Sequence, residues 1–194
     1  MTAVARALRY VAFAVMTLFG LFGGLFVVGY AVDDPGGWVA VGMTALWVLP
    51  LLALSVLAVR RPTTAGPVFV AATTLVIAFT LADSTFGIVP RDDWGPVAAI
   101  VVFTIGVALG FLGLRRPALA GLLLMVAGLA QLVATAIVVA VHAADDGPGP
   151  GAVLTGSSGV VVLPLLVTGL LFLLAGLLDA WSRRRVLRND GSRP

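Results

Sequence analysis

Residues 60–66 are RRPTTAG and residues 115–121 are RRPALAG, so five of seven positions match at an offset of 55. Each copy separates two long apolar stretches. Proline disfavours helical geometry in the residue before it, so an Arg-Pro pair between apolar stretches marks the end of one helix and the start of the next. The two copies therefore predict apolar helices joined by short polar turns.

Six apolar stretches extend outward from these turns, and each approaches the length of about 20 residues that a membrane-spanning helix needs. We predict spans at residues 10–31, 38–59, 66–82, 97–114, 118–141 and 160–178. The expected fold class is an all-α membrane protein with one six-helix transmembrane domain over residues 1–182. An Arg-rich cytoplasmic tail follows at residues 183–194, and we expect it to be disordered from residue 186.

The composition supports a membrane location. Apolar residues make up 60% of the 194 residues and charged residues 11%, which is more apolar surface than a soluble domain of this size can bury. All cations are arginine and all anions aspartate, a bias typical of GC-rich genomes, so we expect the cell membrane of a prokaryote. Nucleic acid is not an expected partner, because the net charge is only +3 and the arginines lie at segment ends.

The arginines predict an orientation. Eleven of the twelve lie on one side of the predicted membrane, and only Arg91 lies on the other. Positively charged short loops stay in the cytoplasm, so both termini are expected inside. The arginines that set this topology and are expected to contact anionic lipid headgroups are Arg60, Arg61, Arg115, Arg116, Arg183, Arg184 and Arg185.

Three pairs of aspartates alternate with the arginine clusters, at Asp33 and Asp34, Asp92 and Asp93, and Asp145 and Asp146. The alternation predicts three helical hairpins of the same orientation, related by an axis along the membrane normal in a bundle with pseudo-threefold character. Topology does not require the aspartates, since acidic residues contribute little to it. They are either a relic of hairpin duplication, which we favour, or an acidic outer rim that binds cations.

Polar residues within the spans provide the candidate site. None of the charged residues is near the middle of a span, which argues against a carrier with a buried proton relay. Helical spacing groups polar side chains on one face of the third span and one face of the fifth. The candidates for an outward-opening polar cavity are Thr73, Thr80, Asp83, Gln131, Thr135 and His142. The alternative is that they form ordinary hydrogen bonds between helices.

Catalytic, metal and cofactor sites are not predicted, because the chain has no Cys, Glu or Lys and a single His. The favoured function is a non-enzymatic structural or partner-binding membrane module. The expected partners are other membrane proteins or a second copy of the chain, which would bind through Gly/Ala helix faces. Motifs such as Gly20-x3-Gly24 and Gly106-x3-Gly110 also allow close packing of helices within one chain. The alternative is a small-solute or ion permease, or a channel subunit, with a polar path between the third and fifth helices.

Overall fold

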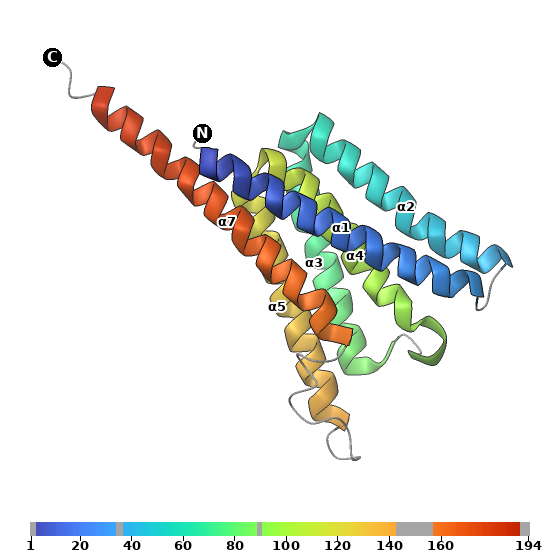
Figure 1. Cartoon of the computed structure of the whole chain (residues 1–194). Helices are drawn as coiled ribbons and strands as arrows, with labels where there is room; N and C mark the ends of the chain where they lie inside the picture. The colour runs from blue at the N-terminus through green and yellow to red at the C-terminus, as the bar shows by residue number, and fades with distance from the viewer. Residues whose placement is uncertain (1–2, 34–36, 89–90, 143–156, 191–194) are drawn as a thin grey trace.

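A computed structural model describes residues 3–33, 37–88, 91–142 and 157–190 (Figure 1). Six helices occupy the predicted apolar stretches, which confirms the all-helical fold, and the described residues include no strand. The helices are α1 (Ala3–Asp33), α2 (Gly37–Arg60), α3 (Pro62–Phe86), α4 (Arg91–Arg115), α5 (Pro117–His142) and α7 (Ser157–Asp190).

Every helix is longer than its predicted span, because the backbone hydrogen bonds continue into polar residues at the ends of the apolar stretches. The largest difference is at the end of α7, which runs to Asp190 and projects beyond the other helices (Figure 1). The expectation of disorder from residue 186 is therefore wrong up to Asp190. Arginine and leucine are good helix formers, so the polar segment continues the helix.

The two Arg-Pro turns have the same backbone geometry. The helix before each turn ends at the first of two arginines, Arg60 or Arg115. The next helix starts at the proline after the second arginine, Pro62 or Pro117. The matching hydrogen bonds, again offset by 55, are Arg61 N to Leu57 O (2.9 Å), Arg116 N to Leu112 O (2.7 Å), Ala65 N to Arg61 O (2.9 Å) and Ala120 N to Arg116 O (3.1 Å). The sequence repeat is thus also a structural repeat at these two corners.

The ends of α3 follow from local chemistry. Arg61 is not helical (φ −134°, ψ 67°), since a residue before proline is disfavoured in the helical region. Proline suits the first helical position, where its missing N–H leaves no bond unmade. The helix stops at Gly87, whose left-handed conformation (φ 61°, ψ 43°) lets its N–H donate to the carbonyl of Asp83 at 2.8 Å.

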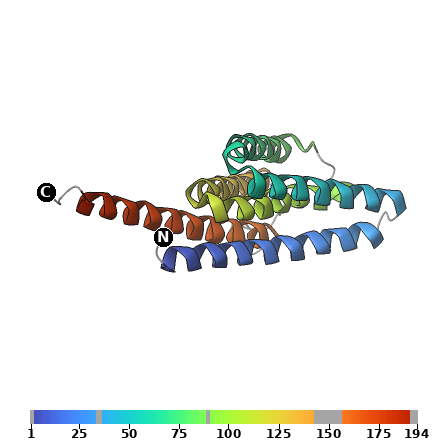
Figure 2. The same cartoon turned by 90° about the horizontal axis from the view of Figure 1, so that it is seen from above.

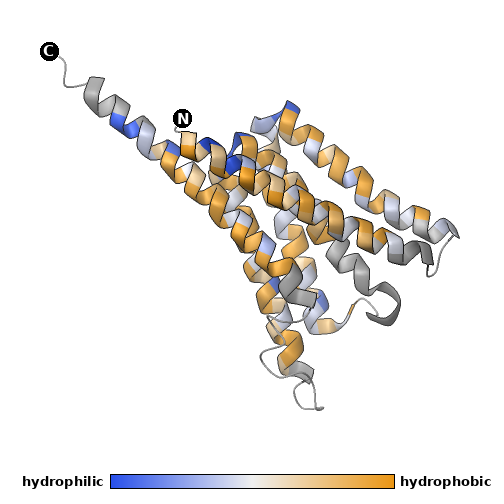
Figure 3. Cartoon of the chain, in the orientation of Figure 1, coloured by the Kyte–Doolittle hydropathy of each residue, from blue (hydrophilic) through white to orange (hydrophobic). Residues whose placement is uncertain are grey.

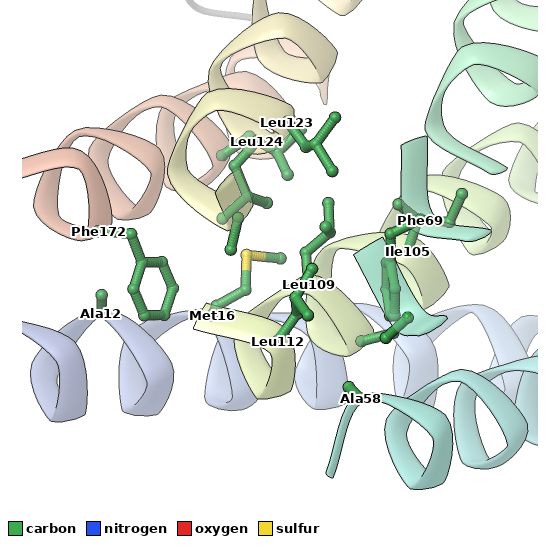
Figure 4. Close-up of a cluster of buried hydrophobic side chains, with 14 of the residues drawn as sticks. Ala12, Met16, Ala58, Phe69, Ile105, Leu109, Leu112, Leu123, Leu124 and Phe172 are labelled. Carbon is green, nitrogen blue, oxygen red and sulfur yellow. The ribbon is translucent and has the colours of Figure 1, made fainter. Parts of the chain in front are cut away.

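Helix α4 is the centre of the bundle. It contacts all five other helices, and residues 102–110 are all buried. The core around it takes side chains from every helix, including Met16, Phe69, Leu109, Leu124 and Phe172 (Figure 4). Figure 2 shows α1 beside α7 on one side of the molecule and α3 on the opposite side.

This packing does not have the expected pseudo-threefold character. In a threefold arrangement the three hairpins would make equivalent internal contacts. Instead, α5 and α7 form the most extensive contact of the bundle, whereas α1 touches α2, and α3 touches α4, only over small areas. The difference follows from one helix, α4, taking the central position.

Glycines allow the closest helix contacts. A Cβ atom on Gly121 of α5 would lie 2.6 Å from the backbone nitrogen of Leu173 and 2.7 Å from the carbonyl oxygen of Gly169 on α7. The backbones of these two helices therefore approach closely, as small residues permit between membrane helices. Gly20 and Gly106, from the two motifs noted in the sequence, likewise pack between α1 and α4 of the same chain.

The outer surface of the bundle is apolar. Among the described residues, four stretches are long and apolar enough to cross a membrane, at Ala3–Phe26, Pro62–Phe86, Pro117–Ala140 and Val161–Ser182, and two shorter apolar stretches lie at Thr44–Arg60 and Val101–Arg115. Only 22–33% of the residues in the apolar windows of the four long stretches are buried inside the protein. Apolar positions line most of each helix, while hydrophilic positions gather near the N-terminus and the α2–α3 corner (Figure 3). So large an exposed apolar surface is typical of a protein surrounded by lipid.

Candidate functional site

Two of the predicted cavity residues are in direct contact. The side-chain amide of Gln131 on α5 donates a hydrogen bond to the hydroxyl of Thr80 on α3 at 3.3 Å. The hydroxyl of Thr135 donates to the carbonyl of Gln131 at 2.9 Å, one turn back along its own helix. These polar groups satisfy one another, a common pattern between helices in lipid.

The space beside this contact is very small. Thr73 and Gln131 line an internal cavity of about 10 Å³ whose other walls are apolar side chains, among them Leu109 and Leu124. That volume holds about one water molecule. Thr73 is 2% exposed, and its hydroxyl has no hydrogen-bond partner within the described part of the chain.

The other two candidates lie toward the far ends of their helices. Asp83 is half-buried one turn beyond Thr80 on α3. His142 is the last residue of α5, and its side chain lies outside the described residues. The structure therefore brings Thr80 and Gln131 into contact between α3 and α5, with Thr73 beside the same small cavity as Gln131. Thr135 is tied only to its own helix.

The paired aspartates fall outside the described side chains, so their proposed cation binding stays a prediction. Within the ranges that the structure describes, no three His, Cys, Asp or Glu residues are close enough to hold a metal ion together.

The sequence analysis missed a buried ion pair. Arg9 of α1 and Asp179 of α7 form a salt bridge in which Nη2 of Arg9 donates to Oδ2 of Asp179. The two residues are 7% and 6% exposed, although 170 positions separate them in the chain. The sequence did contain one indication, because both were expected at span ends on the same side of the membrane. Nothing in the sequence placed α1 beside α7.

An open cavity of about 700 Å³ adjoins this pair, and we call it the corner cavity. It lies between α1, the α4–α5 corner and α7. Its walls are formed by Arg9, Leu114, Arg115, Arg116, Pro117, Ala118, Leu119, Gly176, Asp179 and Ala180. Three arginines and one aspartate are thus among its lining residues.

Arginine-bearing segments from distant parts of the chain meet at this end of the bundle. Arg9 comes from α1 and Arg115 from the end of α4, and both line the corner cavity. An Nη atom of Arg116 lies 3.1 Å from the position that a Cβ on Gly66 would take, so the two Arg-Pro corners are also neighbours.

Comparisons with protein-family models, with curated proteins and with solved structures found no match to this chain.

Proposed function

We propose that this chain is a non-enzymatic integral membrane protein that acts as a structural or partner-binding module. On this proposal all six helices cross the cell membrane, with both termini in the cytoplasm. The apolar outer surface and the clustering of arginines at one end of the bundle support that arrangement.

The observation that carries the proposal is the closed contact between α3 and α5. A permease of the kind predicted from the sequence needs a continuous hydrated path past Thr80, Gln131 and Thr135. Instead, Gln131 bonds to Thr80, and the adjoining cavity has a volume of only about 10 Å³. These features support a packed interface, as in a scaffold.

One observation favours the permease as the second candidate. The buried hydroxyl of Thr73 lacks a hydrogen-bond partner among the described residues and lies beside the same small cavity as Gln131. A polar solute passing between α3 and α5 would find an unsatisfied group there.

A flux assay separates the two candidates. Proteoliposomes containing the purified full-length chain are challenged with glycerol and with K⁺, followed by light scattering and a potential-sensitive dye. We expect rates equal to those of empty liposomes, for the natural chain and for the double variant Gln131→Leu/Thr135→Val. Val133→Ala, at an exposed position on the same helix, is the matched control. A flux that the double variant abolishes and the control retains would refute the structural role.

Partner binding is tested by crosslinking from single cysteines, which the cysteine-free chain permits. Suitable outward positions are Gly42 on α2, Leu75 on α3 and Leu129 on α5, with buried Leu109 as the control. In native membranes we expect a discrete protein adduct from one of these faces and none from the control. If none of the outward positions gives an adduct, the partner-binding role is wrong.

A further inference from the structure

We propose that the corner cavity binds the headgroup of a glycerophospholipid whose phosphodiester carries a hydroxyl group, as in a glycerol headgroup. This assigns a ligand and a site, and therefore goes beyond the structural role proposed above. Four features of the cavity carry the inference: its positive charge, a helix N-terminus, a buried acceptor and the apolar surface beside it.

The charge of the cavity suits a phosphodiester. Arg9, Arg115 and Arg116 against the single carboxylate of Asp179 give a net charge of +2. Guanidinium groups bind phosphate oxygens with two parallel N–H bonds, a geometry that a lysine ammonium does not offer.

The start of α5 adds donors to the same wall. Pro117, Ala118 and Leu119 are the first three residues of that helix, and all three line the cavity. Proline has no N–H, so the donors are the backbone N–H groups of Ala118 and Leu119. Backbone N–H groups in the first turn of a helix have no partner within the helix, and the helix dipole favours negative charge there. An anion in the cavity therefore meets two arginines of the corner together with a helix N-terminus.

Asp179 indicates that the ligand carries a hydrogen-bond donor in addition to the phosphodiester. Its Oδ2 accepts from Arg9, but its buried Oδ1 has no hydrogen-bond partner in the described structure. A bare phosphate would be repelled by this carboxylate and would leave Oδ1 unsatisfied. A hydroxyl group on the headgroup donates to Oδ1 while the phosphodiester remains with the arginines, so one ligand satisfies both kinds of group.

The surroundings of the cavity favour a lipid over a soluble phosphate ester. Leu122 lies one turn after cavity-lining Ala118, and Leu177 lies one turn before Ala180, so each shares the face of its neighbour. Both leucines are exposed, at 52% and 57%. Acyl chains attached to a headgroup in the cavity have this apolar surface beside them.

Native mass spectrometry of the full-length chain in detergent micelles tests the assignment with three probes. Dioctanoyl phosphatidylglycerol carries the phosphodiester and hydroxyl donors. Dioctanoyl phosphatidylmethanol has the same negative charge and carries the phosphodiester without a hydroxyl donor. Glycerol 3-phosphate carries phosphate and hydroxyl groups without acyl chains. We expect phosphatidylglycerol to saturate one site. It should bind about tenfold or more tightly than phosphatidylmethanol, which lacks the hydrogen bond to a charged group. It should also bind about tenfold or more tightly than glycerol 3-phosphate, which lacks the acyl chains that lie on the apolar surface.

Two variants and a matched control locate the site. Arg115→Gln is expected to weaken phosphatidylglycerol binding about tenfold or more. Arg60→Gln removes the same charge from the equivalent position of the sequence repeat, does not line the cavity, and is expected to leave binding within about twofold. Ala180→Phe places a phenyl ring in the cavity from an exposed position without changing charge and should weaken binding about tenfold or more.

Three results would overturn the proposal. Equal losses in Arg115→Gln and Arg60→Gln would show general attraction to positive charge, with no site. Equal binding of phosphatidylmethanol would remove the role of Asp179. Glycerol 3-phosphate binding as tightly as the lipid, with the same dependence on the variants, would exclude a membrane lipid as the source of the headgroup. If Arg115→Gln fails to fold, Arg116→Gln, which removes the neighbouring charge of the same wall, takes its place in the comparison with Arg60→Gln.

Discussion

Replacing one member of the Arg9–Asp179 pair should strongly destabilise the bundle. Both side chains are more than nine-tenths buried, so the variant Arg9→Met leaves the Asp179 carboxylate without its charge partner between α1 and α7. Breaking a buried pair in this way costs about 3–5 kcal/mol, whereas a solvent-exposed pair contributes only about 0–1 kcal/mol. The two magnitudes are far enough apart for one measurement to distinguish them.

The free energy of unfolding can be measured by titrating the purified chain in mixed micelles with dodecyl sulfate and following helicity. We expect a loss of about 3–5 kcal/mol for Arg9→Met and for Asp179→Leu. The double variant Arg9→Met/Asp179→Leu removes both charges and replaces them with apolar side chains, so it should recover to within about 1 kcal/mol of the natural chain. Arg6→Met is the matched control, because Arg6 is exposed on the same helix.

If the double variant loses as much free energy of unfolding as the two single variants together, the effects are additive and Arg9 and Asp179 do not act as a pair. A stabilising pair is equally ruled out if Arg6→Met loses as much stability as Arg9→Met. In that case the total positive charge at the start of α1, and not the buried contact, would determine stability.

Three further predictions concern packing, polarity and topology. Gly121→Ala should lower the free energy of unfolding by about 1–3 kcal/mol, because its Cβ meets backbone atoms of α7. Gly42→Ala, where nothing lies within 4 Å, should be neutral or stabilising by up to about 1 kcal/mol; equal losses would contradict the close approach. Thr80→Val should cost about 0.6 kcal/mol in the same titration, the average for a hydrogen bond between membrane helices, and a change above about 2 kcal/mol would indicate a larger polar network. Cysteines at Thr63 and Thr85, both exposed, should react with a membrane-impermeant maleimide from the cytoplasmic and the outer side respectively; labelling of both from one side would disprove the proposed topology.

The positions of the helices could be predicted from the sequence because lipid selects long apolar stretches. The ends of α2, α3, α4 and α5 at the two corners followed from the Arg-Pro pairs, since proline constrains its neighbour wherever it occurs. The end of α7 was missed because hydropathy locates where the membrane ends, and a helix can continue beyond that point.

The arrangement of the helices could not be predicted in the same way. In lipid the buried face and the outward face of a helix are both apolar, so nothing in the hydropathy of residues 97–114 distinguished the central helix α4 from the others. The polar residues between α3 and α5 were found because polar groups in spans are rare. The Arg9–Asp179 contact was missed because its members lie at span ends, where charges are common and most are solvated.

The ion pair has a consequence for biosynthesis. Asp179 follows Arg9 by 170 residues, which at about 5–20 residues per second corresponds to roughly 9–34 s of synthesis. On the proposed topology, Arg9 spends that interval at the membrane surface among water and headgroups, and it becomes buried only when the last helix arrives. The contact can therefore close only after α7 has been made. A ribosome that stops before α7 releases a protein whose first helix still displays an unburied charge.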